Sequence, residues 1–185
     1  MFLFLLTIAS VVAFFRAGFG NKIIVTGDPR GRRETVVVVG TPKPGTIMDY
    51  VPNTVRSKGN HFSMEPAGTT AASGSRGMGA DGDRNIALAV LLEDDKQGKT
   101  VSDAYVTGTL GEVYYPLPGE EVNLLKLDIA GTGDDVVIGD PLIVDDGTGQ
   151  VVVSTGTPQA EPFIALENIT DPTADTLIWS KRSGG

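Results

Sequence analysis

The sequence predicts an all-β fold: a small β-barrel, β-tulip or sandwich domain with an extended N-terminal arm. Three observations lead to this fold class. The 185-residue chain contains 24 Gly and 11 Pro, residues that favour turns. Val, Ile and Thr are abundant, and β-branched residues favour strands. Short apolar runs recur roughly every 8–12 residues between turn signals, a spacing typical of sandwiches and barrels.

In the first half of the chain, three apolar runs predict strands. Residues 22–26 end at a Gly-Asp-Pro-Arg-Gly turn. Residues 34–39 are apolar on both faces, which indicates a buried strand, and residues 46–51 follow a Pro-rich turn. Residues 52–83 show no periodicity and contain many glycines, so they predict a long loop that is functional or becomes ordered in an assembly.

In the second half, residues 84–93 form a short apolar run before Asp-Asp, which favours a strand over a helix. Residues 121–129 alternate between polar and apolar and predict a half-buried strand. Further runs bounded mostly by Gly or Asp predict strands at 103–107, 112–116, 136–138, 141–144, 150–154, 160–168 and 176–181. No fixed internal repeat is visible in the sequence.

These elements suggest three segments along the chain. Residues 1–55 form an N-terminal arm and the first strands, residues 56–83 a Gly/Pro-rich loop, and residues 84–185 a β domain. The first 15 residues are almost wholly apolar. No basic residue precedes them, as a signal peptide requires, and they are fewer than the roughly 20 apolar residues of a membrane-spanning helix. A cleaved signal, a membrane anchor and an arm buried against a partner chain all stay open.

Charge and composition argue against several classes of function. The net charge of −8 disfavours nucleic-acid binding, because an acidic chain repels phosphates. Without cysteine there is no disulfide, thiolate nucleophile or zinc–thiolate site. One basic cluster departs from the acidic trend, namely Arg30, Arg32 and Arg33. It is either a solvated charged turn or a contact to an acidic partner surface.

The chain offers little for catalysis. Its single histidine, His61, lies in the Gly/Pro-rich loop. Acidic pairs such as Asp145-Asp146 fit hairpin turns, and neighbouring side chains on a strand point to opposite faces. The glycine-rich run 74–82 matches neither phosphate-binding nor dinucleotide-binding patterns. We therefore expect no enzyme activity, no metal and no cofactor.

Four blocks of sequence resemble the head decoration proteins of tailed bacteriophages, also called capsid cement proteins. The first is LLEDDKQGKTVSDAY at 91–105, similar to their LEDDxQGKTVxDAY block. YPLPGEEVNLL at 115–125 resembles their PGDEVNML segment. IGDPL at 138–142 with DGTG at 146–149 resembles a GDxL…DGxG hairpin, and IALE at 164–167 their closing strand. The blocks appear in the family's order over about half of the chain.

The resemblance implies a small β domain on the outer surface of the capsid, with the major capsid protein and the chain itself, as a homotrimer, for partners. It implies no contact with nucleic acid or membrane, and synthesis in the host cytoplasm. The candidate capsid contacts are Arg30, Arg32 and Arg33. The candidates for packing in the core or the trimer are Tyr105, Tyr114, Tyr115 and Trp179.

Two other functions remain open at this point. One is a secreted β-sandwich module for adhesion or carbohydrate binding, with the apolar N-terminus as its signal. The other is a glycoside hydrolase that uses two of the acidic residues.

Overall fold

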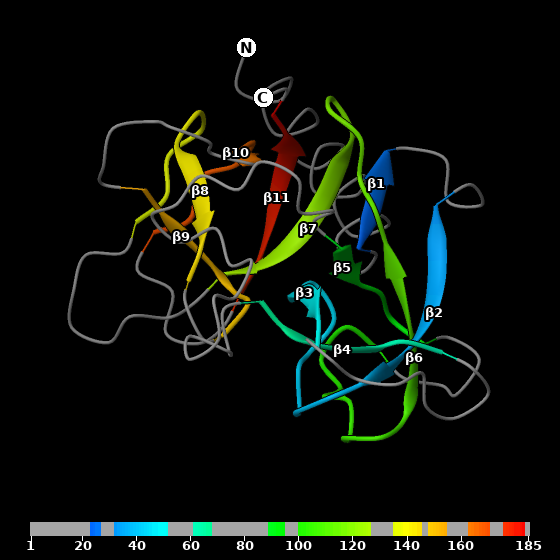
Figure 1. The fold of residues 1–185 in the computed structure, drawn as a ribbon. Coiled ribbons are helices and arrows are strands. Elements are labelled where there is room, and N and C mark those ends of the chain that lie inside the picture. The colour runs from blue at the N-terminus through cyan, green and yellow to red at the C-terminus, as the bar shows by residue number, and fades with distance from the viewer. Residues whose placement is uncertain are drawn as a thin grey trace, which may run out of the picture.

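The computed structural model describes residues 23–26, 32–51, 61–67, 89–94, 100–126, 135–145, 148–154, 163–170 and 176–183. Within these residues the regular structure is entirely β (Figure 1). The predicted all-β barrel class is therefore confirmed. The apolar N-terminus, Arg30 and the glycine-rich run 74–82 lie outside the described residues, and so does most of the predicted 56–83 loop.

Five strands form a first closed barrel, which we call barrel 1. Around the barrel their order is β2, β4, β3, β5 and β6. β2 and β4 pair in parallel, and the other four pairings are antiparallel. The strands are β2 (Arg33–Val38), β3 (Ile47–Tyr50), β4 (Ser63–Pro66), β5 (Ala89–Leu91) and β6 (Leu110–Tyr114).

The next five strands form a second ring, which we call barrel 2, and β1 (Ile24–Thr26) extends its sheet by pairing with β7. Around this ring the order is β7, β9, β8, β10 and β11, and a parallel pairing of β7 with β9 closes it. The strands are β7 (Glu121–Lys126), β8 (Pro141–Val144), β9 (Val151–Val153), β10 (Phe163–Ala165) and β11 (Thr176–Arg182). Figure 1 shows barrel 2 beside barrel 1.

The two barrels share one topology. In each, the first strand pairs in parallel with the third, and the order around the ring is first, third, second, fourth, fifth. The register also agrees in all five pairings. Matching pairs include Met48–Pro66 and Leu142–Val153, Val90–Tyr114 and Ile164–Lys181, and Thr35–Glu112 and Asn123–Trp179. The chain is a tandem repeat in its backbone, which its sequence does not reveal.

Hydrogen bonds outside the strand pairings repeat as well. The N–H of Gly45 donates to the carbonyl of Leu91 (2.8 Å), and the N–H of Gly139 donates to that of Ala165 (2.9 Å). Both glycines have a positive φ, +88° and +96° respectively, where a residue with a Cβ is strained. Each barrel therefore enters its second strand through the same left-handed turn.

The side chains inside the barrels differ, and this hides the repeat. Ala89 of barrel 1 is matched by Phe163 of barrel 2, and Gly111 by Ile178. At Gly111 a Cβ would lie 2.8 Å from Cγ2 of Val38 and 3.0 Å from Tyr105, so Tyr105 fills the space that a larger residue takes in barrel 2. Each interior reaches close packing with its own set of residues.

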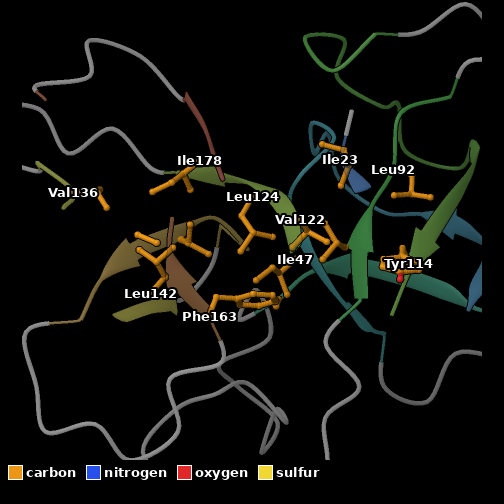
Figure 2. Close-up of a cluster of buried hydrophobic side chains, with 14 residues drawn as sticks. Ile23, Ile47, Leu92, Tyr114, Val122, Leu124, Val136, Leu142, Phe163 and Ile178 are labelled. Atoms are coloured by element: carbon orange, nitrogen blue, oxygen red, sulfur yellow. The ribbon is translucent and has the colours of Figure 1, made fainter. Parts of the chain in front are cut away.

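Barrel 1 inserts the start of β3 into barrel 2. The N–H of Leu125 donates to the carbonyl of Gly45 (2.9 Å), and the N–H of Ile47 donates to that of Gly149 (2.8 Å). The segment thus lies between β7 and the residue that leads into β9. Ile47 is fully buried and belongs to the cluster that includes Val122 and Phe163 of barrel 2 (Figure 2).

Most predicted strands agree with the structure, and three predictions need correction. β4 lies within the segment read as a loop. Residues 103–107 form no strand, because Tyr105 enters the barrel from an irregular segment in which its N–H donates to the carbonyl of Pro42. Residues 136–138 contribute only an isolated bridge between Val136 and Ile169 before a turn.

The strands of barrel 1 come from distant parts of the chain. β2 and β3, which lie within residues 1–55, pair with strands of the predicted 84–185 domain.

Candidate functional site

One end of barrel 1 carries a cluster of aromatic residues around one carboxylate. β2 and β4 begin at this end, whereas β3 and β6 finish here. Their terminal or adjoining residues meet as a group that we call the tyrosine end: Glu34, Tyr50, Phe62 and Tyr115. Each is an even number of residues from an interior residue of its strand, so its side chain leans towards the barrel axis.

The cluster is tightly hydrogen-bonded. The hydroxyl of Tyr50 donates to Oε2 of Glu34 (2.7 Å), and that of Tyr115 lies 2.6 Å from the same oxygen. The two hydroxyl oxygens are 2.6 Å apart. The ring of Phe62 packs edge-on against Tyr50, with centroids 5.3 Å apart. The rings are thereby held in fixed positions, although Tyr50 is 36% exposed.

Both phenols stay protonated at neutral pH. Burial raises the pKa of Tyr115, and its hydrogen bond to Glu34 raises this pKa further. Burial also raises the pKa of Tyr50; the hydrogen bond with Tyr115 lowers it, but Glu34 raises it again. The cluster therefore presents neutral aromatic hydroxyls beside one carboxylate.

Barrel 2 shows that the fold does not require this cluster. The positions equivalent to Glu34, Tyr50, Phe62 and Tyr115 are Val122, Val144, Gly149 and Arg182. There the guanidinium of Arg182 lies over the ring of Phe163, 5.4 Å from its centroid. A barrel of this topology closes without tyrosines, so the tyrosine end is a candidate binding surface. Tyrosine is also among the residues that dominate protein interfaces.

The predicted arginine cluster is divided by its ion pairs. The guanidinium of Arg32 pairs with Glu120 and donates to the hydroxyl of Tyr114 (2.8 Å). Arg33 pairs with Glu112 at 3.1 Å on the outer wall of barrel 1. Arg32 thus joins the two barrels, while Arg33 is the more exposed of the pair. Arg30 lies outside the described residues.

The predicted packing residues occupy three different environments. Tyr105 lies in the core of barrel 1, where its hydroxyl donates to the carbonyl of Leu92 (2.9 Å). Tyr114 is fully buried where the barrels meet. Trp179 is half-buried on β11, and its Nε1–H donates to Glu121 (3.1 Å). Tyr115 belongs to the tyrosine end.

Three members of the tyrosine end, namely Glu34, Tyr50 and Phe62, were not recognised as site residues from the sequence. They stand far apart along the chain and meet only through the register of three strands. The position of Tyr50 at the end of a predicted strand was the only local signal.

The described residues include no group of three or more His, Asp or Glu side chains that could hold a metal ion. His61 is half-buried beside Phe62 in sequence. Within the described part of the chain, no helix is long and apolar enough to cross a membrane.

The fold has a counterpart among solved structures. No family model matches the chain, and no curated protein matches it. The chain is similar to the crystal structure of the head fiber gp8.5 N base in bacteriophage phi29, with 15% sequence identity and a TM-score of 0.44. The match covers 83% of this chain and 97% of that chain.

Proposed function

We propose that the protein is a structural component of a bacteriophage head, which binds the outer surface of the capsid and cements neighbouring major capsid subunits. The order of the four sequence blocks that resemble capsid cement proteins carries this proposal. A non-catalytic role accords with the chemistry of the site, since hydrogen-bonded phenols and one carboxylate provide binding groups.

The blocks occupy framework positions in both barrels. Residues 91–105 run from β5 to Tyr105 in the core of barrel 1, and residues 115–125 lead from the end of β6 into β7. Residues 138–142 form the turn before β8 and the first two residues of that strand, and residues 164–167 begin in β10 and continue past its end. The resemblance therefore extends over the two-barrel core instead of one turn or loop.

The tyrosine end is the surface that we assign to the capsid. Its rings are held rigid by hydrogen bonds, so little side-chain entropy is lost on binding. Its carboxylate suits a basic side chain of the partner, and Arg33 on the adjoining wall suits an acidic one. Binding only the assembled shell would stabilise it by mass action, and a homotrimer would multiply weak contacts into avidity.

The test is addition of the purified protein to undecorated heads, with cryo-EM of the product. We expect added density on the outer surface that bridges capsid subunits, and heads that resist heating longer. A double variant, Tyr50→Ala with Tyr115→Ala, should reduce occupancy, whereas Leu117→Ala, an exposed apolar site outside the cluster, should not. Heads without outer-surface density, or density only at tails, would overturn the proposal.

A further inference from the structure

The junction of the two barrels already holds one guanidinium against a tyrosine and a carboxylate. The guanidinium of Arg32 lies over the ring of Tyr114, 5.5 Å from its centroid, and donates to the hydroxyl of that tyrosine (2.8 Å). It also pairs with Oε1 of Glu120, while Oε2 of Glu120 accepts from the hydroxyl of Tyr114 (2.7 Å). One carboxylate thus binds a phenol through one oxygen and a guanidinium through the other.

The tyrosine end has a carboxylate and phenols in the same arrangement, but its carboxylate has an oxygen to spare. Oε2 of Glu34 accepts from the hydroxyls of Tyr50 (2.7 Å) and Tyr115 (2.6 Å). Among the described residues, none donates a hydrogen bond to Oε1 of Glu34. Arg33, the cation next to Glu34 on β2, pairs instead with Glu112 (3.1 Å) on the outer wall. The carboxylate is therefore able to accept a further donor.

The equivalent end of barrel 2 contains a guanidinium of its own. Arg182 stands at the position equivalent to Tyr115, and its guanidinium lies over the ring of Phe163, 5.4 Å from the centroid. Phe163 pairs with Arg182 across β10 and β11, so ring and cation meet at the end that corresponds to the tyrosine end. Barrel 2 thus supplies both an aromatic ring and a cation at this end, whereas the tyrosine end consists of aromatic rings and a carboxylate.

We infer that the tyrosine end binds the guanidinium of an arginine side chain that projects from a protein partner. Tyr50 is 36% exposed, so a partner can reach it. A planar guanidinium can lie against this ring and direct an N–H to Oε1 of Glu34 at the same time, as that of Arg32 does within the chain. An ammonium group is more strongly hydrated and has no planar face, so lysine fits the site less well.

The inference deepens the proposed function, because it names the chemical group that the tyrosine end takes from its partner. It rests on that proposal only for the identity of the partner. A short arginine peptide can stand in for the partner, so binding can be measured without heads and the two proposals can fail separately.

The experiment is an NMR titration of the isotope-labelled full chain with three capped tripeptides. The probes are acetyl-Gly-Arg-Gly-amide, its lysine counterpart, and its citrulline counterpart, which has nearly the same shape but no charge. We expect the arginine peptide to give saturable shifts of the amide signals of Glu34, Tyr50 and Tyr115. The lysine peptide should bind about two- to fivefold more weakly, and the citrulline peptide about fivefold more weakly or less tightly still.

Two substitutions test the carboxylate and the ring separately. Glu34→Gln keeps an acceptor for the phenols but removes the charge, and it should weaken binding of the arginine peptide by about fivefold. Tyr50→Leu removes the exposed ring and should weaken it by about two- to fivefold. Asp103→Asn is the matched control, because it removes one charge from an exposed residue outside the tyrosine end. It should leave the affinity unchanged, and circular dichroism should be native for all three variants.

Shifts that do not saturate, or equal affinities for the three peptides, would overturn the inference. So would a loss in Asp103→Asn as large as that in Glu34→Gln. Binding that appears only after Arg30→Gln or Arg56→Gln, at residues outside the described part of the chain, would make the chain's own arginine the ligand and would also overturn it. Heads decorated by a protein that binds no arginine peptide would support the proposed function and remove this inference, and arginine binding without decoration would do the reverse.

Discussion

Arg32 and Glu120 stand at equivalent positions of the two barrels, and their side chains pair with each other. Each residue precedes the first strand of its barrel. The carbonyl of Arg32 accepts a hydrogen bond from the N–H of Tyr115 (3.1 Å), and that of Glu120 accepts one from Arg182 (2.8 Å). The Glu120 carboxylate also accepts from Tyr114, so a single side chain connects the end of barrel 1 to the start of barrel 2.

This connection predicts loss of stability in acid. Burial alone would raise the pKa of Glu120, but hydrogen bonds from Arg32, the N–H of Leu117 and Tyr114 outweigh it, and the pKa lies below its usual value. The Glu120 carboxylate therefore contributes fully to the free energy of unfolding above its unfolded-state pKa of about 4.3. This contribution is lost as the pH falls through the lower folded-state pKa. Thermal unfolding across this range should show the decline.

Glu120→Gln should remove that part of the decline and lower the free energy of unfolding at pH 7 by about 1.5–3 kcal/mol, as expected for hydrogen bonds to a charged group. The matched control is Glu112→Gln, which breaks the exposed pair with Arg33 and should cost less than about 1 kcal/mol. Equal effects of the two substitutions would show that the ion pair between the barrels stabilises the fold no more than the exposed pair does.

The junction also predicts an unequal pair of glycine substitutions. Gly108 and Gly149 both have a positive φ, +84° and +66°, so alanine is strained by about 1–2 kcal/mol at either. A Cβ at Gly149 would lie 2.4 Å from the carbonyl oxygen of Ile47, whereas at Gly108 no atom lies within 4 Å. We expect Gly149→Ala to lose about 1–3 kcal/mol more than Gly108→Ala in urea unfolding. Similar losses would contradict the close approach of the barrels.

Strands that are bounded by turn residues could be located from the sequence alone. Residues 141–144 are bounded by turn signals, and the predicted range coincides with β8. β4 was missed because Ser63, Glu65 and Pro66 carry little strand propensity, and its pairing with β2 and β3 decides its conformation. Residues 103–107 were predicted as a strand because they precede a glycine turn, whereas in the structure Tyr105 lies in an irregular segment.

The repeat and the tyrosine end could not be predicted from the sequence, because both depend on how distant strands pair. Topology is conserved between the barrels while residue size is exchanged, as at Ala89 and Phe163, so no run of letters recurs. The tyrosine end assembles from separate strands, and its members become neighbours only once the register is known. The arginine cluster was visible in the sequence, but the partners that engage Arg32 and Arg33 lie far along the chain.

A third prediction concerns the core of barrel 1. Tyr105→Phe removes the buried hydrogen bond to the carbonyl of Leu92 while it keeps the ring in place. The carbonyl is left without that donor, so the free energy of unfolding should fall by about 1–2 kcal/mol, with an unchanged dependence on denaturant concentration. A loss below about 0.5 kcal/mol would mean that water replaces the hydroxyl.

The four tyrosines predict a cooperative loss of structure in alkali. Burial raises the pKa of every one of them, and nearby carboxylates add to the effect at Tyr105 and Tyr115. A group whose pKa is raised in the folded state contributes fully to the free energy of unfolding below its unfolded-state pKa, here about 10. This contribution is lost as the pH rises through the higher folded-state pKa. Tyrosinate absorbance should therefore stay low at pH 10 and rise together with the loss of β-sheet circular dichroism. In Tyr105→Phe the transition should move to lower pH, because the native state starts out less stable. A phenol that titrates near pH 10 while the circular dichroism stays native would contradict the burial of these hydroxyls.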